Sequence, residues 1–218
     1  MADLDGVYSA RFSDADHRAK MRLWREIVAA IAGIVPLEAP VLDLACDRGY
    51  FIANVRAGER WASDIRDVDA DLPGEVRFVQ ASGLSIDAEV PSDHFATVFT
   101  SNYLEHLASS DEVVEQMRVV ARMLRPGGRF VVLQPNIRLV GGAYWDFIDH
   151  HTPLTERSLQ EAGALAGLVT ERTIVRFLPF TTKSRLPQDP RLVRLYLRFR
   201  PAWSVLGKQT LWVGRRPA

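Results

Sequence analysis

The chain has 218 residues, no formal net charge, 47% hydrophobic and 25% charged residues, which is typical of a globular domain and excludes a disordered or fibrous chain. The single cysteine, Cys46, can form no internal disulfide, and no apolar run is long enough to span a membrane. Because polar and acidic residues follow Met1, we expect no leader peptide and a cytoplasmic location.

The first predicted element is a helix over residues 16–35, where apolar residues recur at three- and four-residue steps until Pro36 ends the pattern. Its apolar stripe is expected to pack against a sheet. The residues before it, 1–14, are expected to form an arm, and its Tyr8 and Phe12 are candidates to fold over a ligand.

The stretch PVLDLACDRGYF (40–51) is typical of a buried strand, a tight turn and a helix that begins at Gly49. Small residues in such a turn let a ligand approach the free backbone N–H groups at the helix end. The next predicted strand, RWASDI (60–65), places Asp64 about 20 residues after Asp43, where nucleotide-binding folds keep the carboxylate that holds ribose hydroxyls.

Five further strands are predicted from short apolar runs bounded by turn residues: 76–81, 95–100, 129–133, 173–178 and 209–213. Two helices lie between them. Ser109 and Glu112 have the spacing of a capping box, and Thr155 is placed to cap a helix that Gly167 ends. Helices that alternate with strands predict an α/β fold with a doubly wound, mostly parallel sheet.

The segments VLDLACDRGYF, WASDI, VRFVQAS, FATVFTSNYLEHL and LRPGGRFVVLQPN, in this order, resemble class I S-adenosylmethionine-dependent methyltransferases. The tail, with DFIDHHTPLTERSLQEAGALAGL and FLPFTTKSRLP, resembles small methyltransferases of sugar, glycolipid or natural-product pathways. The resemblance implies one Rossmann-like domain with seven strands, the last antiparallel, and helices on both faces. Its parts are expected to be an arm and helix (1–35), a cofactor-binding core (40–136) and a substrate-side region (137–218).

The resemblance also implies the residues around S-adenosylmethionine. Asp64 is expected to accept both ribose hydroxyls, since one carboxylate has two oxygens. Asn102 and Tyr103 are expected at the methionine end, Asp43 is expected to position the turn, and Cys46 is expected to be a small buried hydrophobe. The full set of implied cofactor residues is Asp43, Ala45, Cys46, Asp47, Gly49, Asp64, Ile65, Ser82, Gly83, Asn102 and Tyr103.

Three positions depart from the family pattern. Ala45 and Asp47 stand where glycines are expected, and Ser82 stands where an acid commonly binds the adenine amino group. The Asp47 side chain can crowd the cofactor and repel its carboxylate, or attract its ammonium or sulfonium. Two hypotheses therefore stay open: altered but intact cofactor binding, and a degenerate pocket.

Aromatic and titratable residues gather after the fifth predicted strand, in YWDFIDHH (144–151). Histidine titrates near neutral pH, so His150 is the predicted general base, with Asp149 or Asp146 to orient it and Tyr144 to line the pocket. The alternative is a histidine that only holds its loop through a backbone carbonyl.

No metal is expected, because the acids and histidines of residues 146–151 show no helix-spaced ligand pattern. Glu105 and His106 lie at the predicted carboxyl end of the fourth strand. Two interpretations stay open for them: they border the ligand crevice, or they cap the next segment.

The charges are unevenly distributed, because residues 171–218 contain eleven Lys and Arg but only two Asp and Glu. In 190–206, arginines alternate with apolar and aromatic residues, as in a helix that contacts lipid or a phosphate-bearing substrate. We favour the other interpretation, in which the helix packs on its own domain with its arginines directed outward. No nucleic-acid partner is expected, since the chain lacks zinc-ligand arrays and an overall basic excess.

The sequence therefore predicts an enzyme that moves a methyl group from S-adenosylmethionine to oxygen or nitrogen of a small acceptor. One alternative is a non-methylating descendant with a degenerate cofactor turn. An NAD-dependent dehydrogenase is less favoured, because only one glycine of its G-x-G-x-x-G pattern is present.

Overall fold

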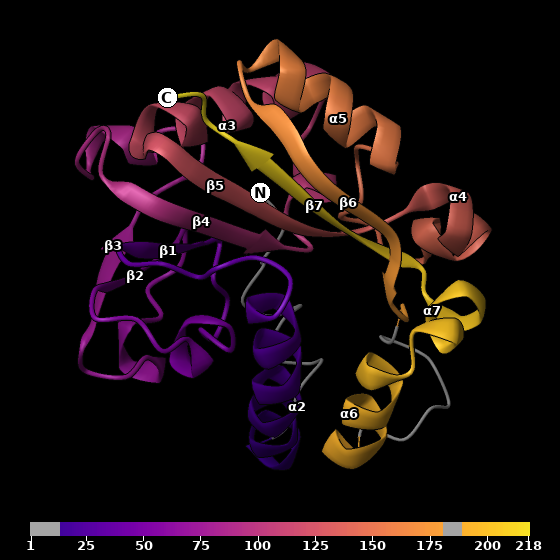
Figure 1. Cartoon of the computed structure of the whole chain (residues 1–218). Helices are drawn as coiled ribbons and strands as arrows, with labels where there is room; N and C mark the ends of the chain where they lie inside the picture. The colour runs from indigo at the N-terminus through magenta and orange to yellow at the C-terminus, as the bar shows by residue number, and fades with distance from the viewer. Residues whose placement is uncertain (1–13, 181–188) are drawn as a thin grey trace.

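The computed structural model describes residues 14–180 and 189–218, so the predicted arm with Tyr8 and Phe12 lies outside the described residues. A seven-stranded sheet in the order β3-β2-β1-β4-β5-β7-β6 forms the centre of the fold (Figure 1). β1 to β5 are parallel, and β7 is antiparallel to β5 and β6, as the sequence predicts. The strands are β1 (Val41–Leu44), β2 (Arg60–Asp64), β3 (Val76–Gln80), β4 (Phe95–Ser101), β5 (Leu124–Pro135), β6 (Val169–Leu178) and β7 (Gln209–Arg215).

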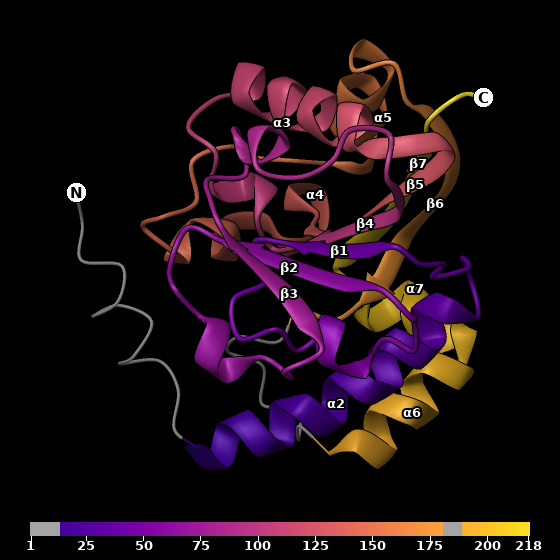
Figure 2. The ribbon, with the colours of Figure 1, turned by 90° about the vertical axis from the view of Figure 1, so that its left-hand side faces the viewer.

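Helices cover both faces of this sheet, which confirms the doubly wound α/β class (Figures 1 and 2). α3 (Ser110–Met123) and α5 (Glu156–Leu165) cover one face, and α2 (Asp14–Ala32), α6 (Pro190–Arg198) and α7 (Arg200–Leu206) cover the other. Each face has its own apolar core. The remaining elements are short: α4 (Ile137–Val140) and the 3-10 helices η1 (Ile52–Asn54), η2 (Asp69–Asp71), η3 (Ile86–Ala88), η4 (Leu104–His106) and η5 (Gly141–Asp146).

The predicted helix caps are present. The Ser109 side chain accepts a hydrogen bond from the Glu112 N–H, and Thr155 forms a capping box with Ser158. The helix expected to begin at Gly49 begins later and is shorter, because a turn leads into η1. Gly49 has a φ of +65°, outside the right-handed helical region, and the chain is already extended at Val55, so only the single turn of η1 fits between them.

Two element boundaries also differ from the prediction. β5 begins at Leu124 instead of Arg129, because Leu124 pairs with Phe95 before a register shift and the Gly127 N–H donates to the Arg216 carbonyl. β6 begins at Val169 instead of Thr173, because β7 extends far enough to pair with its first residues.

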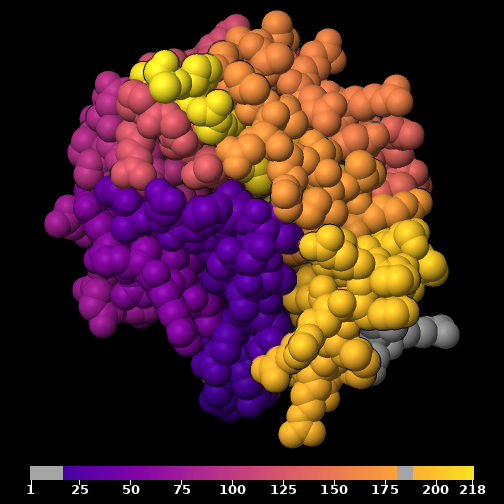
Figure 3. Space-filling model, viewed as in Figure 1, coloured from indigo at the N-terminus to yellow at the C-terminus, as the bar shows by residue number. Residues whose placement is uncertain are grey.

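The arginine-rich tail is two helices, of which α6 packs against α2 and α7 packs against β6 and α6. Figure 3 shows the tail beside α2 on the surface. A single helix is interrupted because Pro201 has no N–H to bond back into α6. Leu197 and Trp203 are buried, and Arg194 forms an ion pair of 2.7 Å with Glu26 of α2, which confirms the packing interpretation for this face. In the described part of the chain, no helix has the length and apolar character needed to cross a membrane.

Candidate functional site

The carboxyl ends of β1, β2 and β4 lie at one edge of the sheet, where ligands of open α/β folds bind. Two groups of residues gather there. We call residues 43–49 together with 64–66 the turn side, and residues 105, 106 and 150 the histidine side. These two sides follow neighbouring strands, β1 and β4. The strands are joined near their carboxyl ends, where the Thr100 hydroxyl of β4 donates to the Leu44 carbonyl of β1 at 2.8 Å.

The turn side keeps the backbone shape of a glycine-rich turn, although two of the three expected glycines are replaced. Ala45 has a φ of 56° and Asp47 a φ of 51°, both in the left-handed region that glycine adopts most easily. Gly49 has a positive φ as well, and a Cβ on it would lie 2.2 Å from Leu72. Gly49 is therefore favoured by its backbone conformation and by the nearness of the Leu72 side chain, whereas Ala45 and Asp47 hold the same turn shape with some strain.

Asp43 and Cys46 lie beneath this turn. One carboxylate oxygen of Asp43 accepts the Ile52 N–H at 3.3 Å, which is the positioning role expected of it. Burial raises the pKa of Asp43 well above its usual value. Cys46 is buried in the core, and burial also raises the pKa of its thiol, so this side chain behaves as the small hydrophobe predicted.

Asp64 is 7% exposed and lies at the centre of a small network. Its Oδ2 accepts the Asp47 N–H at 3.0 Å, and its Oδ1 accepts the N–H and the Nε of Arg66 at 3.0 and 3.1 Å. Arg66 also donates to Asp47 Oδ1 at 2.8 Å. The two carboxylates raise the pKa of Arg66, although partial burial acts against this. The Asp47 charge is thus paired within the protein, a contact that sequence reasoning missed.

The loop after β3 lies beside the residues that follow the carboxyl end of β4. The Tyr103 hydroxyl donates to Gln116 Oε1 at 2.8 Å, and the Gln116 side chain donates to the Gly83 carbonyl at 2.9 Å. A Cβ on Gly83 would lie 2.3 Å from that hydroxyl. Tyr103 thus lies beside the loop expected to contact adenine.

The other predicted residues of this edge are more open to solvent. Asn102 is exposed, with a φ of 49°, and Ile65 is 62% exposed. Ser82 is partly buried. Their side chains can therefore be reached by a ligand that lies across the strand ends.

On the histidine side, two distant segments meet. Glu105 and His106 belong to η4, directly after β4, and His150 belongs to the loop after η5. The rings of His106 and His150 have centroids 5.2 Å apart. The Glu105 carbonyl accepts the N–H groups of His151 and Thr152 at 2.8 and 3.0 Å, which fixes the loop against η4. Sequence reasoning left the placement of Glu105 and His106 open, and the structure puts them beside the predicted base.

Two of the predicted partners of His150, Asp149 and Tyr144, form contacts with other residues of the histidine side and its loop. The Asp149 carbonyl accepts from His106 Nδ1 at 2.8 Å, and an Asp149 carboxylate oxygen is 3.6 Å from the same nitrogen, so Asp149 orients His106. Tyr144 is fully buried, and its hydroxyl donates to the Thr152 carbonyl at 2.6 Å. Its ring lies 4.7 Å from that of His150, so Tyr144 supports His150 from behind rather than lining an open pocket with its hydroxyl.

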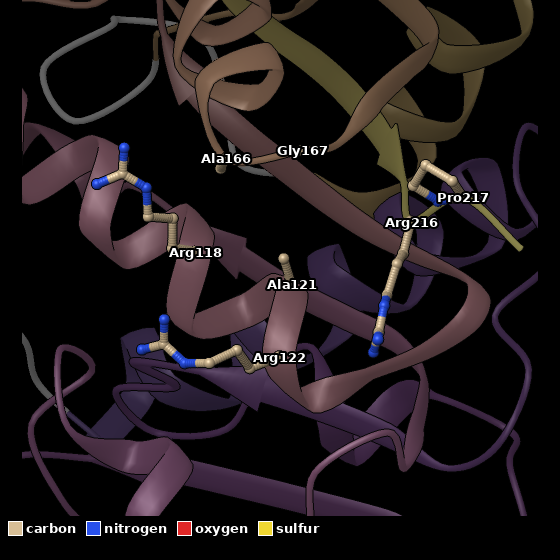
Figure 4. A pocket seen from close by; sticks show the side chains of 7 residues that line it. All are labelled: Arg118, Ala121, Arg122, Ala166, Gly167, Arg216 and Pro217. Atoms are coloured by element: carbon tan, nitrogen blue, oxygen red, sulfur yellow. The ribbon is translucent and has the colours of Figure 1, made fainter.

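A hollow of about 420 Å³ lies elsewhere, between α3, the end of α5 and the chain end after β7 (Figure 4). Its three arginines are paired with acids, Arg118 with Glu115, Arg122 with Asp87 and Arg216 with Asp93. It adjoins the amino end of β5, because the Arg216 N–H donates to the Gly128 carbonyl. The hollow is therefore remote from the strand ends that carry the candidate site.

Comparison with known proteins finds methyltransferases both by sequence and by structure. Residues 15–173 match the model of a family described as "Methyltransferase domain". The ubiquinone/menaquinone biosynthesis C-methyltransferase UbiE of Pseudomonas putida (strain GB-1) is 28% identical over 141 residues, which are 56% of this chain and 53% of that protein. The chain thus spans about half the length of the curated relatives it matches.

Two solved structures share the fold over nearly the whole chain. A structure of the Haloferax volcanii Trm112 methyltransferase activator in complex with a methyltransferase aligns with a TM-score of 0.65 at 20% identity, covering 94% of this chain and 96% of that one. An S-adenosylmethionine-dependent methyltransferase from Mesorhizobium loti aligns with a TM-score of 0.63 at 18% identity, covering 88% and 98%.

Proposed function

The chain belongs to the family described as "Methyltransferase domain". From this premise we propose that it is a class I S-adenosylmethionine-dependent methyltransferase and that it methylates an oxygen or nitrogen atom of a small acceptor. Sugars, glycolipid precursors and secondary metabolites are the acceptor classes we propose. The observation that carries the proposal is the meeting of Glu105, His106 and His150 at the end of β4, beside the cofactor turn.

The turn side fits S-adenosylmethionine. Its backbone keeps positive φ values at Ala45, Asp47 and Gly49, so the substitutions have not closed the bend. This favours altered but intact binding over a degenerate pocket. Asp43 supports the bend from below through the Ile52 N–H.

We assign the ribose hydroxyls to Asp64, because it lies at the end of β2 and is the best-buried carboxylate of that loop. A carboxylate has about four acceptor positions, and the protein donates four hydrogen bonds to Asp64, so a ribose hydroxyl has to displace a protein donor. Its weakest contact, from Arg66 Nη2 to Oδ2 at 3.5 Å, is the one a ribose hydroxyl would replace. Arg66 would then remain paired with Asp47, and its positive charge would offset the repulsion between the Asp47 carboxylate and the cofactor carboxylate.

The remaining predicted residues divide between the two ends of the cofactor. Ser82 and Gly83, with the Tyr103 ring beside them, are assigned to the adenine end. Asn102 and the turn from Ala45 to Gly49 are assigned to the methionine end. Ile65, exposed next to Asp64, is assigned an apolar contact with the nucleoside.

When bound, S-adenosylmethionine supplies a methyl group already activated on a sulfonium. What the protein must add is alignment, exclusion of water and removal of the acceptor's proton. His150 is held between the rings of Tyr144 and Phe147, at centroid distances of 4.7 and 4.9 Å, with its imidazole toward His106. From this position it can take the proton of an acceptor O–H or N–H as the oxygen or nitrogen bonds to carbon.

The curated relatives are named as carbon methyltransferases, so the acceptor atom needs a direct test. Labelled S-adenosylmethionine should be incubated with panels of hydroxyl, amine and activated-carbon acceptors, and the product should be located by mass spectrometry. Transfer to oxygen or nitrogen supports the proposal, and transfer to carbon alone refutes the choice of atom.

Calorimetric titration with S-adenosylmethionine separates the remaining alternative. Binding without transfer to any acceptor would favour a non-methylating descendant of the fold. Absence of binding at high ligand concentration would instead show that the turn no longer holds the cofactor.

A further inference from the structure

The histidine side contains three side chains that can each offer one metal ligand. The candidate ligand atoms of Glu105, His106 and His150 all lie within 4.8 Å of one another. They come from two segments, η4 and the loop after η5, which the Glu105 carbonyl joins through two backbone hydrogen bonds. The cluster is thus set by the fold and does not depend on exposed, mobile side chains.

The Glu105 carboxylate is the first sign of a missing positive partner. Its side chain has no exposed surface. Oε2 accepts from the Gln134 amide at 2.8 Å, but Oε1 has no hydrogen-bond partner among the described residues. A buried carboxylate oxygen without a donor is unfavourable, and a bound cation would compensate it.

His106 is held in the tautomer that a metal requires. Its Nδ1 lies 2.8 Å from the Asp149 carbonyl, which can only accept, so Nδ1 carries the hydrogen. The lone pair is therefore on Nε2. A metal-binding histidine commonly donates its other N–H to a carbonyl or carboxylate, and His106 has both nearby, since an Asp149 carboxylate oxygen is 3.6 Å away.

From these observations we propose that Glu105, His106 and His150 bind one divalent transition-metal ion, of which Zn²⁺ fits best. One carboxylate and two imidazoles are a common zinc set, and three protein ligands leave at least one position open. Ligand atoms in a tetrahedral zinc site are about 3.4 Å apart, so ligand atoms that are now up to 4.8 Å apart need to close by at most about 1.4 Å. Sequence reasoning excluded a metal because it searched one segment, whereas the set combines two.

The open coordination position could bind the acceptor of the methyl group, an inference that rests on the proposed function. An acceptor hydroxyl bound there would lose its proton more readily, since the cation stabilises the oxyanion. His150 would then be a metal ligand in the loaded enzyme instead of the base, and the released proton would pass to solvent through the open edge.

The test measures metal binding directly and needs no acceptor. Metal-free full-length protein is titrated with Co²⁺, whose visible absorption reports coordination, and Zn²⁺ is used to displace it. We expect one equivalent per chain. His106→Asn and His150→Ala should each weaken binding by about tenfold or more, while His151→Ala, which changes the exposed neighbour, should have no effect.

Glu105→Gln is a further variant, and because Glu105 is buried, its folding is checked by circular dichroism. If it does not fold, the two histidine variants decide the result. Absence of a stoichiometric site, or binding that survives His106→Asn and His150→Ala unchanged, overturns the proposal. Titration of the same samples with S-adenosylmethionine is independent of the metal, so failure of this proposal and failure of the proposed function are distinguishable.

Discussion

The turn side and the histidine side lie at the ends of adjacent strands, yet they are built in different ways. The turn side is made mainly by backbone: three positive φ values and a hydrogen bond to the buried Asp43. The histidine side is made by side chains that meet from segments 45 positions apart, Glu105 and His150. The bend at residues 45–49 tolerates changes of side chain at Ala45 and Asp47 as long as its backbone shape is kept, whereas the histidine side depends on the identity of each residue.

This difference predicts how the two sides respond to substitution. Substitutions on the turn side should lower the affinity for S-adenosylmethionine or the folding stability. Substitutions on the histidine side should lower turnover. The variants that follow test that division, beginning with the largest expected effect.

His150→Ala should lower turnover by about 100-fold or more, because it removes either a general base or a metal ligand. Affinity for S-adenosylmethionine should change by less than about twofold, since Asp64 and the turn are untouched. Steady-state kinetics with the best acceptor, together with calorimetry, measures both quantities. His151→Ala is the matched control, and full activity in the His150 variant would remove this residue from the chemistry.

Asp64→Ala should weaken S-adenosylmethionine binding by about 100-fold, the equivalent of two hydrogen bonds to a charged group at about 1.5 kcal/mol each. Calorimetric titration measures the change, and Asp67→Ala, an exposed acid in the same loop, is the control. Thermal melting of both variants shows whether the fold survives. A binding constant unchanged by Asp64→Ala would place the ribose elsewhere.

Asp43→Asn should stabilise the protein without cofactor, by on the order of 1 kcal/mol, or a few degrees in melting temperature. Burial raises the pKa of Asp43, so the wild type is more stable when this group is protonated and loses that stability as the pH rises from about 3.8 through the raised pKa. Asparagine keeps an acceptor for the Ile52 N–H and has no charge to bury.

The measurement for this variant is thermal melting at several pH values. The advantage of Asp43→Asn over the wild type should grow as the pH increases, because only the wild-type side chain ionises. A stability difference that stays constant between acidic and alkaline pH would contradict a buried, titrating Asp43.

Much of the fold could be predicted from the sequence, because it depends on local patterns. Apolar runs of strand length and caps such as Ser109 and Thr155 gave the order of the elements. The errors fell where a tertiary contact overrode the pattern: Gly49, held at positive φ, and Leu124, drawn into β5 by Phe95.

The candidate site divides in the same way. The turn and Asp64 follow strand ends directly, so their place was predictable from chain order. Arg66 over Asp47, and Tyr103 against Gly83, depend on side-chain directions that no spacing encodes. His150 was predicted from the YWDFIDHH segment, and the LEHL segment held the signal for its neighbours, an acid followed at once by a histidine at the end of β4.

Ala45→Gly and Asp47→Gly should have the smallest effects, and they test whether backbone shape alone defines the turn side. Ala45→Gly relieves a left-handed φ of 56° and should stabilise the protein by about 0.5 to 1 kcal/mol. Asp47→Gly gains less, because it also removes the partly exposed pair with Arg66, so the net change should be near zero. Both variants should bind S-adenosylmethionine within about threefold of the wild type by calorimetry. Loss of binding in Asp47→Gly but not in Ala45→Gly would show that the Asp47 carboxylate itself holds the cofactor, and the bend would then depend on a side chain as the histidine side does.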